Sequence, residues 1–381
     1  MPEQVARLIF AGGGTGGHLY PAIAIANRVQ ELLMERMRVD IRFVGTRRGI
    51  EYARRDSIGF PLELINIRGL ARSLTPANLL VPFLMIGSLI KCWLMIKRLR
   101  PHVVVGTGGY VAWPVLRAAA WRGIPAVLQE QNSFPGMTTR RLAPHVQRIY
   151  LGFEQARQYL KTEAHIMATG NPVRHEITRG DRHRAITSLG LSHDRKTILI
   201  LGGSQGAHAV NQAILRSLTT GGLPDDVQLI WQTGERDYKD VAAQVEDQGF
   251  GLSLFPFAND MAGIYAAADF AVARAGALTL AELEACGLPA LLIPYRFAAG
   301  DHQRKNAQAF VKANAAIVVN EEEFNTRDIL AEAANIVRSD RLLQMQQAVR
   351  AMSAGRRPAV DVIAEDIINL IETTRKDTTH P

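Results

Sequence analysis

The sequence predicts an α/β fold with two Rossmann-like, doubly wound domains. The chain has 381 residues, 47% of them hydrophobic, which is enough for two hydrophobic cores. Two segments, beginning at Arg7 and at Lys196, each run from an apolar strand through a glycine-rich loop into a helix. Strand and helix patterns alternate after both openings, which indicates parallel sheets with helices on both faces.

The remaining elements follow in the same alternation. Strand-like runs in the first half lie at Ile41–Val44, Val103–Val105, Ala126–Leu128 and Arg148–Leu151. Those in the second half lie at Gln228–Trp231, Leu252–Phe255, Phe270–Ala273 and Ala290–Ile293. A polar stretch, Gly170–Arg184, predicts the hinge between the halves. We therefore expect domains over residues 1–175 and 176–357, and an amphipathic helix within 358–381 that packs back on the first domain.

Charge and cysteine content narrow the class of protein. The net charge of +8 favours phosphate-bearing or membrane partners, but the basic residues are not grouped with aromatic ones, so no nucleic acid is expected. Cys92 and Cys286 lie far apart, which indicates neither a disulfide framework nor a metal site. A glycine loop follows the N-terminal strand at once, so we expect no signal peptide and a cytoplasmic protein.

Glycine loops end three of the predicted strands. Gly12–Gly17 contains the GxGxxG spacing that brings backbone N–H groups and a helix N-terminus to an anion. The next strand ends in Gly45 and Thr46, without the acidic residue that a nicotinamide enzyme uses for its ribose, which argues against a dehydrogenase. The other loops are Gly106–Tyr110 and Gly202–Ala207. Because ligands bind at the carboxyl ends of parallel strands, the three loops together predict a binding site.

Polar side chains accompany these loops. His18 follows the first loop and is either a general base or a locally packed histidine. Glu130–Asn132, EQN, ends an apolar strand, where three polar residues indicate a site because they are costly if buried unpaired. In the second half, Glu282 either accepts the ribose hydroxyls of a nucleotide or stabilises a helix N-terminus. Asp301–Gln303 either face a sugar or cap the next helix.

Metal dependence is not expected. No two aspartates have the DxD spacing by which metal-dependent nucleotide-sugar enzymes commonly hold a diphosphate. Helix N-termini and loop amides would have to hold the diphosphate instead.

Six motifs, in order along nearly the whole chain, resemble the MurG family of N-acetylglucosaminyltransferases. They are GGTGGH at 13–18, GTGGY at 106–110, EQN at 130–132, GNPVR at 170–174, GGSQGA at 202–207 and GALTLAE at 276–282. The resemblance implies a GT-B fold, in which the two domains face each other across a cleft. It implies inverting transfer of GlcNAc from UDP-GlcNAc to the C4 hydroxyl of MurNAc in undecaprenyl-pyrophosphoryl-MurNAc-pentapeptide, which converts lipid I to lipid II in peptidoglycan synthesis. No cofactor is implied.

The resemblance also assigns roles to residues. Those on the donor side are Thr15, Gly16, Gly17, Asn132, Arg174, Ser204, Ala258, Ala277, Leu278, Thr279, Leu280, Ala281, Glu282 and Gln303. His18, Tyr110 and Glu130 belong to the acceptor side, and His18 and Glu130 stay alternative bases. The chain departs from the family at Gln129, where histidine is frequent, and at Ala258, where a bulky aliphatic residue is frequent, so that only the backbone of Ala258 is expected to read uracil.

Other activities stay open on the sequence. A diacylglycerol glucosyltransferase and a UDP-GlcNAc 2-epimerase have the same fold, although the epimerase needs no lipid acceptor. A non-catalytic UDP-sugar-binding scaffold of a cell-wall complex is a third alternative, against which the intact loops argue.

One apolar run bears on the lipid acceptor. Leu79–Ile96 carries a single charge, Lys91, and is just long enough for a membrane span, but a span would separate strands of one sheet. Burial on the sheet explains only one face, because the run is apolar nearly all round. Its basic neighbours are Arg68, Arg72, Lys97, Arg98 and Arg100. We expect shallow insertion into an anionic leaflet at the cytoplasmic face of the plasma (inner) membrane, where lipid I is met. Contacts with other cell-wall synthesis proteins stay open.

Overall fold

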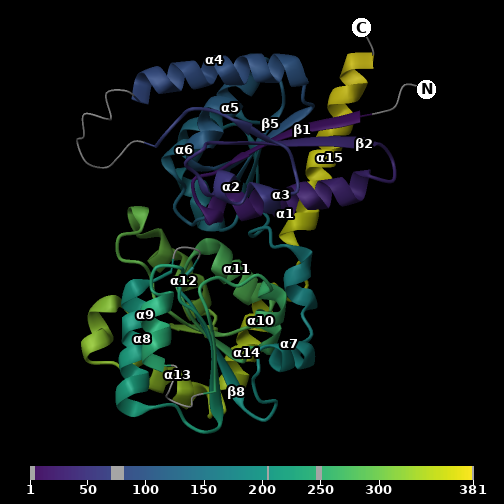
Figure 1. The fold of residues 1–381 in the computed structure, drawn as a ribbon. Helices are drawn as coiled ribbons and strands as arrows, with labels where there is room; N and C mark the ends of the chain where they lie inside the picture. Colours follow the sequence, from purple (N-terminus) through teal and green to yellow (C-terminus); the bar gives the residue numbers. More distant parts are fainter. Residues whose placement is uncertain (1–4, 70–80, 204–205, 246–250, 380–381) are drawn as a thin grey trace. The chain divides into compact units, whose positions relative to one another are not determined.

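The computed structural model describes residues 5–69, 81–203, 206–245 and 251–379, and the chain divides into two compact units (Figure 1). Unit 1 comprises Met1–Pro172 and Arg357–Pro381, and unit 2 comprises Val173–Arg356. The chain therefore leaves unit 1 within the polar stretch Gly170–Arg184 and returns to it shortly before the last helix.

Unit 1 is built on a parallel sheet of seven strands in the order β3-β2-β1-β4-β5-β6-β7. The strands are β1 (Val5–Gly12), β2 (Arg38–Gly45), β3 (Leu62–Leu64), β4 (Val103–Gly108), β5 (Ala126–Glu130), β6 (Arg148–Leu151) and β7 (His165–Ala168). Strands β4 and β5 are buried at every residue, as is usual for a parallel sheet that helices cover on both faces. The four strand runs predicted for this half lie within β2, β4, β5 and β6.

Helices cover both faces of this sheet (Figure 1). They are α1 (Gly16–Leu33), α2 (Ile50–Ala53), α3 (Arg55–Ile58), α4 (Val81–Leu99), α5 (Gly109–Trp121), α6 (Met137–Leu142) and α15 (Ala359–Thr379), with 3-10 turns at Ala143–His145 and Glu154–Tyr159. One hydrophobic cluster joins α4 and α5 to the sheet, and another joins α1 and α15.

The last helix packs on unit 1. Its residues Ile363, Ile367 and Ile371 are buried in the cluster that contains α1. At its start, the Arg28 guanidinium donates to Asp361 Oδ1 at 2.6 Å. Apolar burial and this ion pair together hold the C-terminal segment beside the N-terminal one, although more than 300 residues separate them.

Unit 2 repeats the plan with a parallel sheet of six strands in the order β10-β9-β8-β11-β12-β13. The strands are β8 (Lys196–Leu201), β9 (Val227–Gln232), β10 (Leu252–Phe255), β11 (Phe270–Ala273), β12 (Ala290–Leu292) and β13 (Ala316–Val318). Its helices are α7 (Arg182–Ser188), α8 (His208–Gly221), α9 (Tyr238–Val245), α10 (Met261–Ala267), α11 (Ala277–Ala285), α12 (His302–Lys312), α13 (Ile329–Val337) and α14 (Arg341–Ser353), with 3-10 turns at His175–Arg179, Ala299–Asp301 and Glu321–Asn325. The prediction of two doubly wound α/β domains is confirmed.

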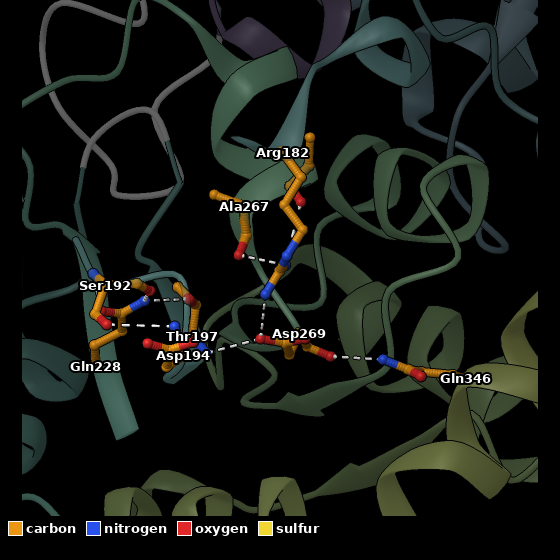
Figure 2. A network of polar contacts seen from close by, with 9 residues as sticks. Arg182, Ser192, Asp194, Thr197, Gln228, Ala267, Asp269 and Gln346 are labelled. Atoms are coloured by element: carbon orange, nitrogen blue, oxygen red, sulfur yellow. Dashed lines mark hydrogen bonds and ion pairs between the residues drawn. The ribbon is translucent and has the colours of Figure 1, made fainter. Parts of the chain in front are cut away.

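A polar network ties α7 to the sheet of unit 2 (Figure 2). Asp269 precedes β11, and its Oδ2 accepts from the Arg182 guanidinium at 2.9 Å and from the Thr197 amide at 2.8 Å. Nearby, the buried Gln228 amide bonds both the backbone of Ser192 and the Thr197 hydroxyl. These contacts are satisfied within the fold, so the network is structural.

In each parallel sheet, the order in which successive strands are added changes direction once, and the candidate site residues lie at this point. In unit 1 the reversal lies between β1 and β4, and in unit 2 it lies between β8 and β11. The loops after the carboxyl ends of these strands diverge there, which is where doubly wound sheets bind ligands. The predicted glycine loops after β1, β4 and β8 all lie at these two positions.

Candidate functional site

Glycines let the two loops of unit 1 approach each other closely. Gly12 ends β1 opposite Gly108 of β4, and a Cβ on Gly12 would lie 1.7 Å from the Thr107 Oγ1. A Cβ on Gly109 would lie 2.4 Å from the Gly13 carbonyl oxygen, and Gly109 has a φ of 75°. Side chains at either position would push the loops apart, so glycine is required there.

A buried carboxylate lies beneath the first loop. Glu51, in α2, is 0% exposed. Its Oε2 accepts the Gly14 amide at 2.9 Å, and its Oε1 accepts the amide and hydroxyl of Thr46 at 2.9 and 3.2 Å. The Gly14 N–H is therefore turned inward, and Gly16 and Gly17 begin α1, where the N-terminus of a helix is suited to an anion. Sequence reasoning did not find Glu51, because no glycine-loop pattern includes an acid from a neighbouring helix.

The ring of His18 packs on the second loop and has a defined orientation. Its Nδ1 lies 2.9 Å from the Thr107 carbonyl oxygen and 3.0 Å from Gln131 Oε1. The Thr107 hydroxyl in turn donates to the His18 carbonyl at 2.7 Å. Within the described part of the chain, Nε2 has no hydrogen-bond partner. His18 is thus held through one ring nitrogen and can offer the other to a substrate.

Glu130 is engaged by its own loop. It ends β5 and is 3% exposed. Its Oε1 accepts the Asn132 amide at 3.0 Å, and its Oε2 accepts the Gly136 amide at 3.1 Å. Both oxygens therefore shape the turn that carries Asn132, and this leaves Glu130 less available for proton transfer than His18.

Tyr110 lies beside the same loop. It belongs to the first turn of α5, and its hydroxyl lies 3.4 Å from Thr46 Oγ1. A Cβ on Gly14 would lie 3.0 Å from the Tyr110 ring, so the ring covers this glycine. In unit 1 the structure thus brings together Thr15, Gly16, Gly17 and His18 at the start of α1, and Tyr110 at the start of α5, around the ends of β1 and β4. Glu130 and Asn132 follow at the end of β5, the strand next to β4.

In unit 2, Glu282 accepts a hydrogen bond from a buried tyrosine. It belongs to α11, and its Oε2 accepts the hydroxyl of the buried Tyr265, on α10, at 2.8 Å. Burial raises the pKa of Glu282, while the Tyr265 hydrogen bond and the charge of Arg174 lower it. Arg174, predicted as a donor contact, is therefore close enough to Glu282 to stabilise its charged form. Tyr265 was missed because it lies 17 residues before Glu282 in an apolar helix.

The first turn of α11 contains the other predicted donor residues. Leu280 makes the first helical hydrogen bond, to the Gly276 carbonyl at 2.9 Å, so the residues before it form the N-terminal turn of the helix. Ala277, Leu278, Thr279, Leu280 and Ala281 follow from there to Glu282. Ser204, the predicted contact in the loop after β8, lies outside the described residues.

Two further donor predictions have intramolecular partners. Gln303, in the first turn of α12, accepts the Tyr295 amide with its Oε1 at 2.9 Å. The Ala258 amide donates to Gln232 Oε1 at 3.0 Å, so its carbonyl is the backbone group left for uracil. Among the described residues, no three His, Cys, Asp or Glu side chains gather to hold a metal ion. The roles of all these residues stay predictions.

Most of the predicted apolar run lies in α4. Its first two residues, Leu79 and Leu80, lie outside the described residues, as does Arg72. One face of α4 is buried through Cys92, Met95 and Ile96. The opposite face exposes Phe83, Ile86, Ile90 and Leu94, with Trp93 beside them. None of the described helices is both long and apolar enough to cross a bilayer.

Comparisons with known proteins identify the family of the chain. The glycosyltransferase family 28 N-terminal domain matches residues 8–151, and the C-terminal domain of the same family matches residues 197–361. The UDP-N-acetylglucosamine–N-acetylmuramyl-(pentapeptide) pyrophosphoryl-undecaprenol N-acetylglucosamine transferase of Salinibacter ruber is 38% identical over 375 residues, 98% of this chain and 100% of that one. The enzyme of the same name from Chlorobaculum parvum is 39% identical over 369 residues, 96% of this chain and 99% of that one.

Solved structures show the same fold. The crystal structure of MurG from Acinetobacter baumannii superposes with a TM-score of 0.70 and 26% identity, covering 97% of this chain and 99% of that one. A structure titled as a UDP-N-acetylglucosamine 2-epimerase from Listeria monocytogenes has a TM-score of 0.66 over 100% of this chain and 99% of that one, but only 14% identity, and so shares the fold alone. The resemblance drawn from the six motifs is confirmed, and the chain belongs to glycosyltransferase family 28 as a member of the MurG family.

Proposed function

We propose that this protein transfers GlcNAc from UDP-GlcNAc to the MurNAc C4 hydroxyl of undecaprenyl-pyrophosphoryl-MurNAc-pentapeptide. The names of relatives that match nearly the whole chain support the donor and the lipid acceptor. The observation that carries the chemistry is the orientation of His18, whose Nδ1 faces two oxygen atoms while Nε2 has no partner in the described structure.

In the proposed reaction, His18 Nε2 takes the proton of the acceptor hydroxyl as its oxygen attacks C1 of GlcNAc. The new C1–O4 bond forms while the bond from C1 to the UDP oxygen breaks, and UDP leaves with the electron pair. Attack from the face opposite UDP inverts the anomeric centre. A positioned general base typically contributes about 10²–10⁴-fold in rate. Glu130, with both oxygens on backbone amides, is the second candidate for the base.

Unit 2 holds the donor in this proposal. Glu282 accepts ribose hydroxyls with the carboxylate oxygen that Tyr265 leaves open, and Arg174 favours its charged form. The N-terminus of α11 and the loop after β8 face the diphosphate, where helix amides stabilise the negative charge that grows on departing UDP. Thr15, Gly16, Gly17, Asn132 and Gln303 complete the predicted contacts to the sugar and diphosphate.

The lipid acceptor requires a membrane surface, and the exposed face of α4 offers a docking patch. We define the docking patch as Phe83, Ile86, Ile90, Trp93 and Leu94 of α4 with Trp121 of α5. Phe83 is 73% exposed and Trp121 is 57% exposed. Exposed apolar side chains of this size are suited to shallow insertion among lipid acyl chains.

Cations surround the docking patch. The Lys97 ammonium and the Arg122 guanidinium lie 5.7 and 5.0 Å from the Trp93 ring centre, and Arg117 lies 5.0 Å from that of Trp121. Each basic residue near an anionic leaflet contributes about 1 kcal/mol to binding. Arg98, by contrast, pairs with Glu63 at 2.8 Å. We therefore propose peripheral attachment of unit 1 to the cytoplasmic face of the inner membrane. Any contact with other cell-wall synthesis proteins stays an open prediction.

One assay tests the activity. The protein is incubated in detergent with UDP-GlcNAc and a lipid I analogue of short prenyl chain, with diacylglycerol, or without acceptor, and the products are identified by mass and by linkage. A β-1,4-linked GlcNAc-MurNAc lipid in the first tube alone supports the proposal. A GlcNAc-bearing diacylglycerol, or a UDP-sugar epimer without acceptor, would identify one of the rival activities.

A further inference from the structure

The neighbours of His18 form a closed set of buried amides. Gln129, Gln131 and Asn171 are 0%, 3% and 9% exposed. The Gln129 Nε2 donates to Asn171 Oδ1 at 2.9 Å, the Asn171 Nδ2 donates to the Gln131 carbonyl at 3.0 Å, and the Gln131 Nε2 donates to the Gln129 side chain. We name these three residues the amide ring.

The amide ring determines which way the Gln131 side chain faces. Its Nε2 also donates to the Thr107 carbonyl at 2.7 Å and to the Gln129 carbonyl at 3.1 Å. The flipped amide would place an oxygen against these carbonyl oxygens, which is unfavourable in a buried site. Gln131 Oε1 is therefore the atom that faces His18.

The proton of the His18 ring follows from this orientation. Nδ1 faces the Thr107 carbonyl oxygen and Gln131 Oε1, and neither atom can donate a hydrogen bond. Nδ1 must carry the hydrogen, so the lone pair of the neutral ring lies on Nε2, the nitrogen that a base needs free. Partners that fix a histidine tautomer in this way are part of the chemistry of the site.

We propose that Gln131 is a positioning residue for the base of the transfer reaction: held by the amide ring, it fixes the tautomer and direction of His18 together with the Thr107 carbonyl. This rests on the proposed role of His18. All three members of the amide ring, Gln129, Gln131 and Asn171, have uncharged side chains. His18 is thus held by neutral acceptors, without the carboxylate that would favour its charged, non-basic form.

Other titratable groups near His18 make their contacts elsewhere. Glu51 lies under Gly13 and Gly14 and bonds Thr46, Tyr110 lies against Gly14, and the Glu130 oxygens bond backbone amides. A charge introduced at position 131 would therefore be the nearest one to the His18 Nδ1.

The test uses Gln131→Met, which keeps length and removes both hydrogen-bonding groups. We expect kcat to fall about tenfold, the worth of one neutral hydrogen bond, with the KM for UDP-GlcNAc unchanged. In spectra of ¹⁵N-labelled imidazole, the His18 signals, identified by their absence in His18→Ala, should show a larger fraction of the Nε2–H tautomer, because only the Thr107 carbonyl is left to hold the Nδ1 hydrogen. A parent-like kcat and ring spectrum would overturn the proposal.

A second variant covers poor folding of the first. Gln131→Glu keeps an oxygen toward Nδ1 and adds a charge that favours the imidazolium form, so the acid limb of the kcat/KM profile should move to higher pH. If the acid limb of Gln131→Glu lies at the same pH as that of the parent, the proposal is overturned. The matched control is Gln228→Met in unit 2, a buried amide in the network of Figure 2 that should lower stability without changing the limb or the His18 spectrum.

The His18→Ala variant separates the hypothesis that His18 is the base from the hypothesis that Gln131 positions it. If His18→Ala keeps its kcat, His18 is not the base, and the positioning proposal falls with it. If His18→Ala loses kcat while both Gln131 variants behave like the parent, only the role of Gln131 is wrong.

Discussion

Removing the Tyr265 hydroxyl should weaken donor binding without disturbing the fold. Tyr265 is 3% exposed, and its hydroxyl donates to Glu282 Oε2 at 2.8 Å. A hydrogen bond to a charged group contributes about 1.5–3 kcal/mol. If all of that energy were lost from UDP binding, the affinity for UDP would fall about 10- to 150-fold, which sets the upper limit of the effect. Because Tyr265→Phe keeps the ring and leaves the carboxylate in place, we expect UDP to bind about tenfold more weakly.

The pH dependence of UDP binding gives a second, independent test of Tyr265→Phe. The charged carboxylate binds ribose hydroxyls best, and it exists above the pKa of Glu282, which burial raises and Tyr265 lowers. Loss of the hydroxyl raises that pKa further, so UDP affinity should begin to fall at a higher pH than in the parent. Calorimetric titration with UDP over a series of mildly acidic to neutral buffers measures both effects.

The chain contains a matched control for this experiment. Tyr150 is also fully buried, and its hydroxyl also donates to a carboxylate at 2.8 Å, that of Asp366 in unit 1. Tyr150→Phe should lower the melting temperature but leave UDP affinity and its pH dependence unchanged. Parent-like UDP binding by Tyr265→Phe, together with parent-like binding by Glu282→Ala, would refute the assignment of Glu282 to the ribose.

Three further predictions concern the base, the metal and the membrane. His18→Ala should lower kcat by about two to four orders of magnitude with donor affinity nearly intact, and a loss confined to KM would transfer the base role to another group. Turnover in detergent should survive excess chelator, and full loss restored by magnesium or manganese would contradict a metal-free mechanism. Charge reversal of Lys97, Arg117 and Arg122 should reduce sedimentation with anionic vesicles and leave UDP binding unchanged; equal sedimentation would show that the docking patch is wrong. The control makes the same charge change at three exposed arginines of unit 2: Arg216, Arg341 and Arg350.

The fold was largely predictable because both sheets are built from strongly apolar central strands. The eight strand runs read from the sequence all correspond to strands, the last of them one residue shorter than predicted. The strands that were not predicted, β3, β7 and β13, are edge strands of three or four residues. Short, partly exposed strands carry too little apolar pattern to be separated from loops.

The candidate site was predictable only at its loops. Glycine spacing located the ends of β1, β4 and β8, because close approach of backbones requires glycine there. Partners of the functional side chains were not found, since their contacts span long sequence separations. His18 and Gln131 are 113 residues apart, and Glu51 reaches Gly14 over 37 residues. No local periodicity records such a contact, so only the folded chain shows it.

The same physical arrangement occurs in both units, and it fits the roles proposed for His18 and Glu282. His18 is held at Nδ1 by uncharged oxygens, and Glu282 is held at Oε2 by an uncharged hydroxyl. In each case one polar atom of the side chain is fixed and the other has no hydrogen-bond partner in the described structure. For His18, neutral partners fix direction without the charge stabilisation that a salt bridge would bring, whereas the charge of Arg174 also favours the ionised form of Glu282. The side chain is therefore oriented before substrate arrives while its second atom keeps its full capacity to accept a proton or a hydroxyl hydrogen, which is what a transfer between two bound sugars requires.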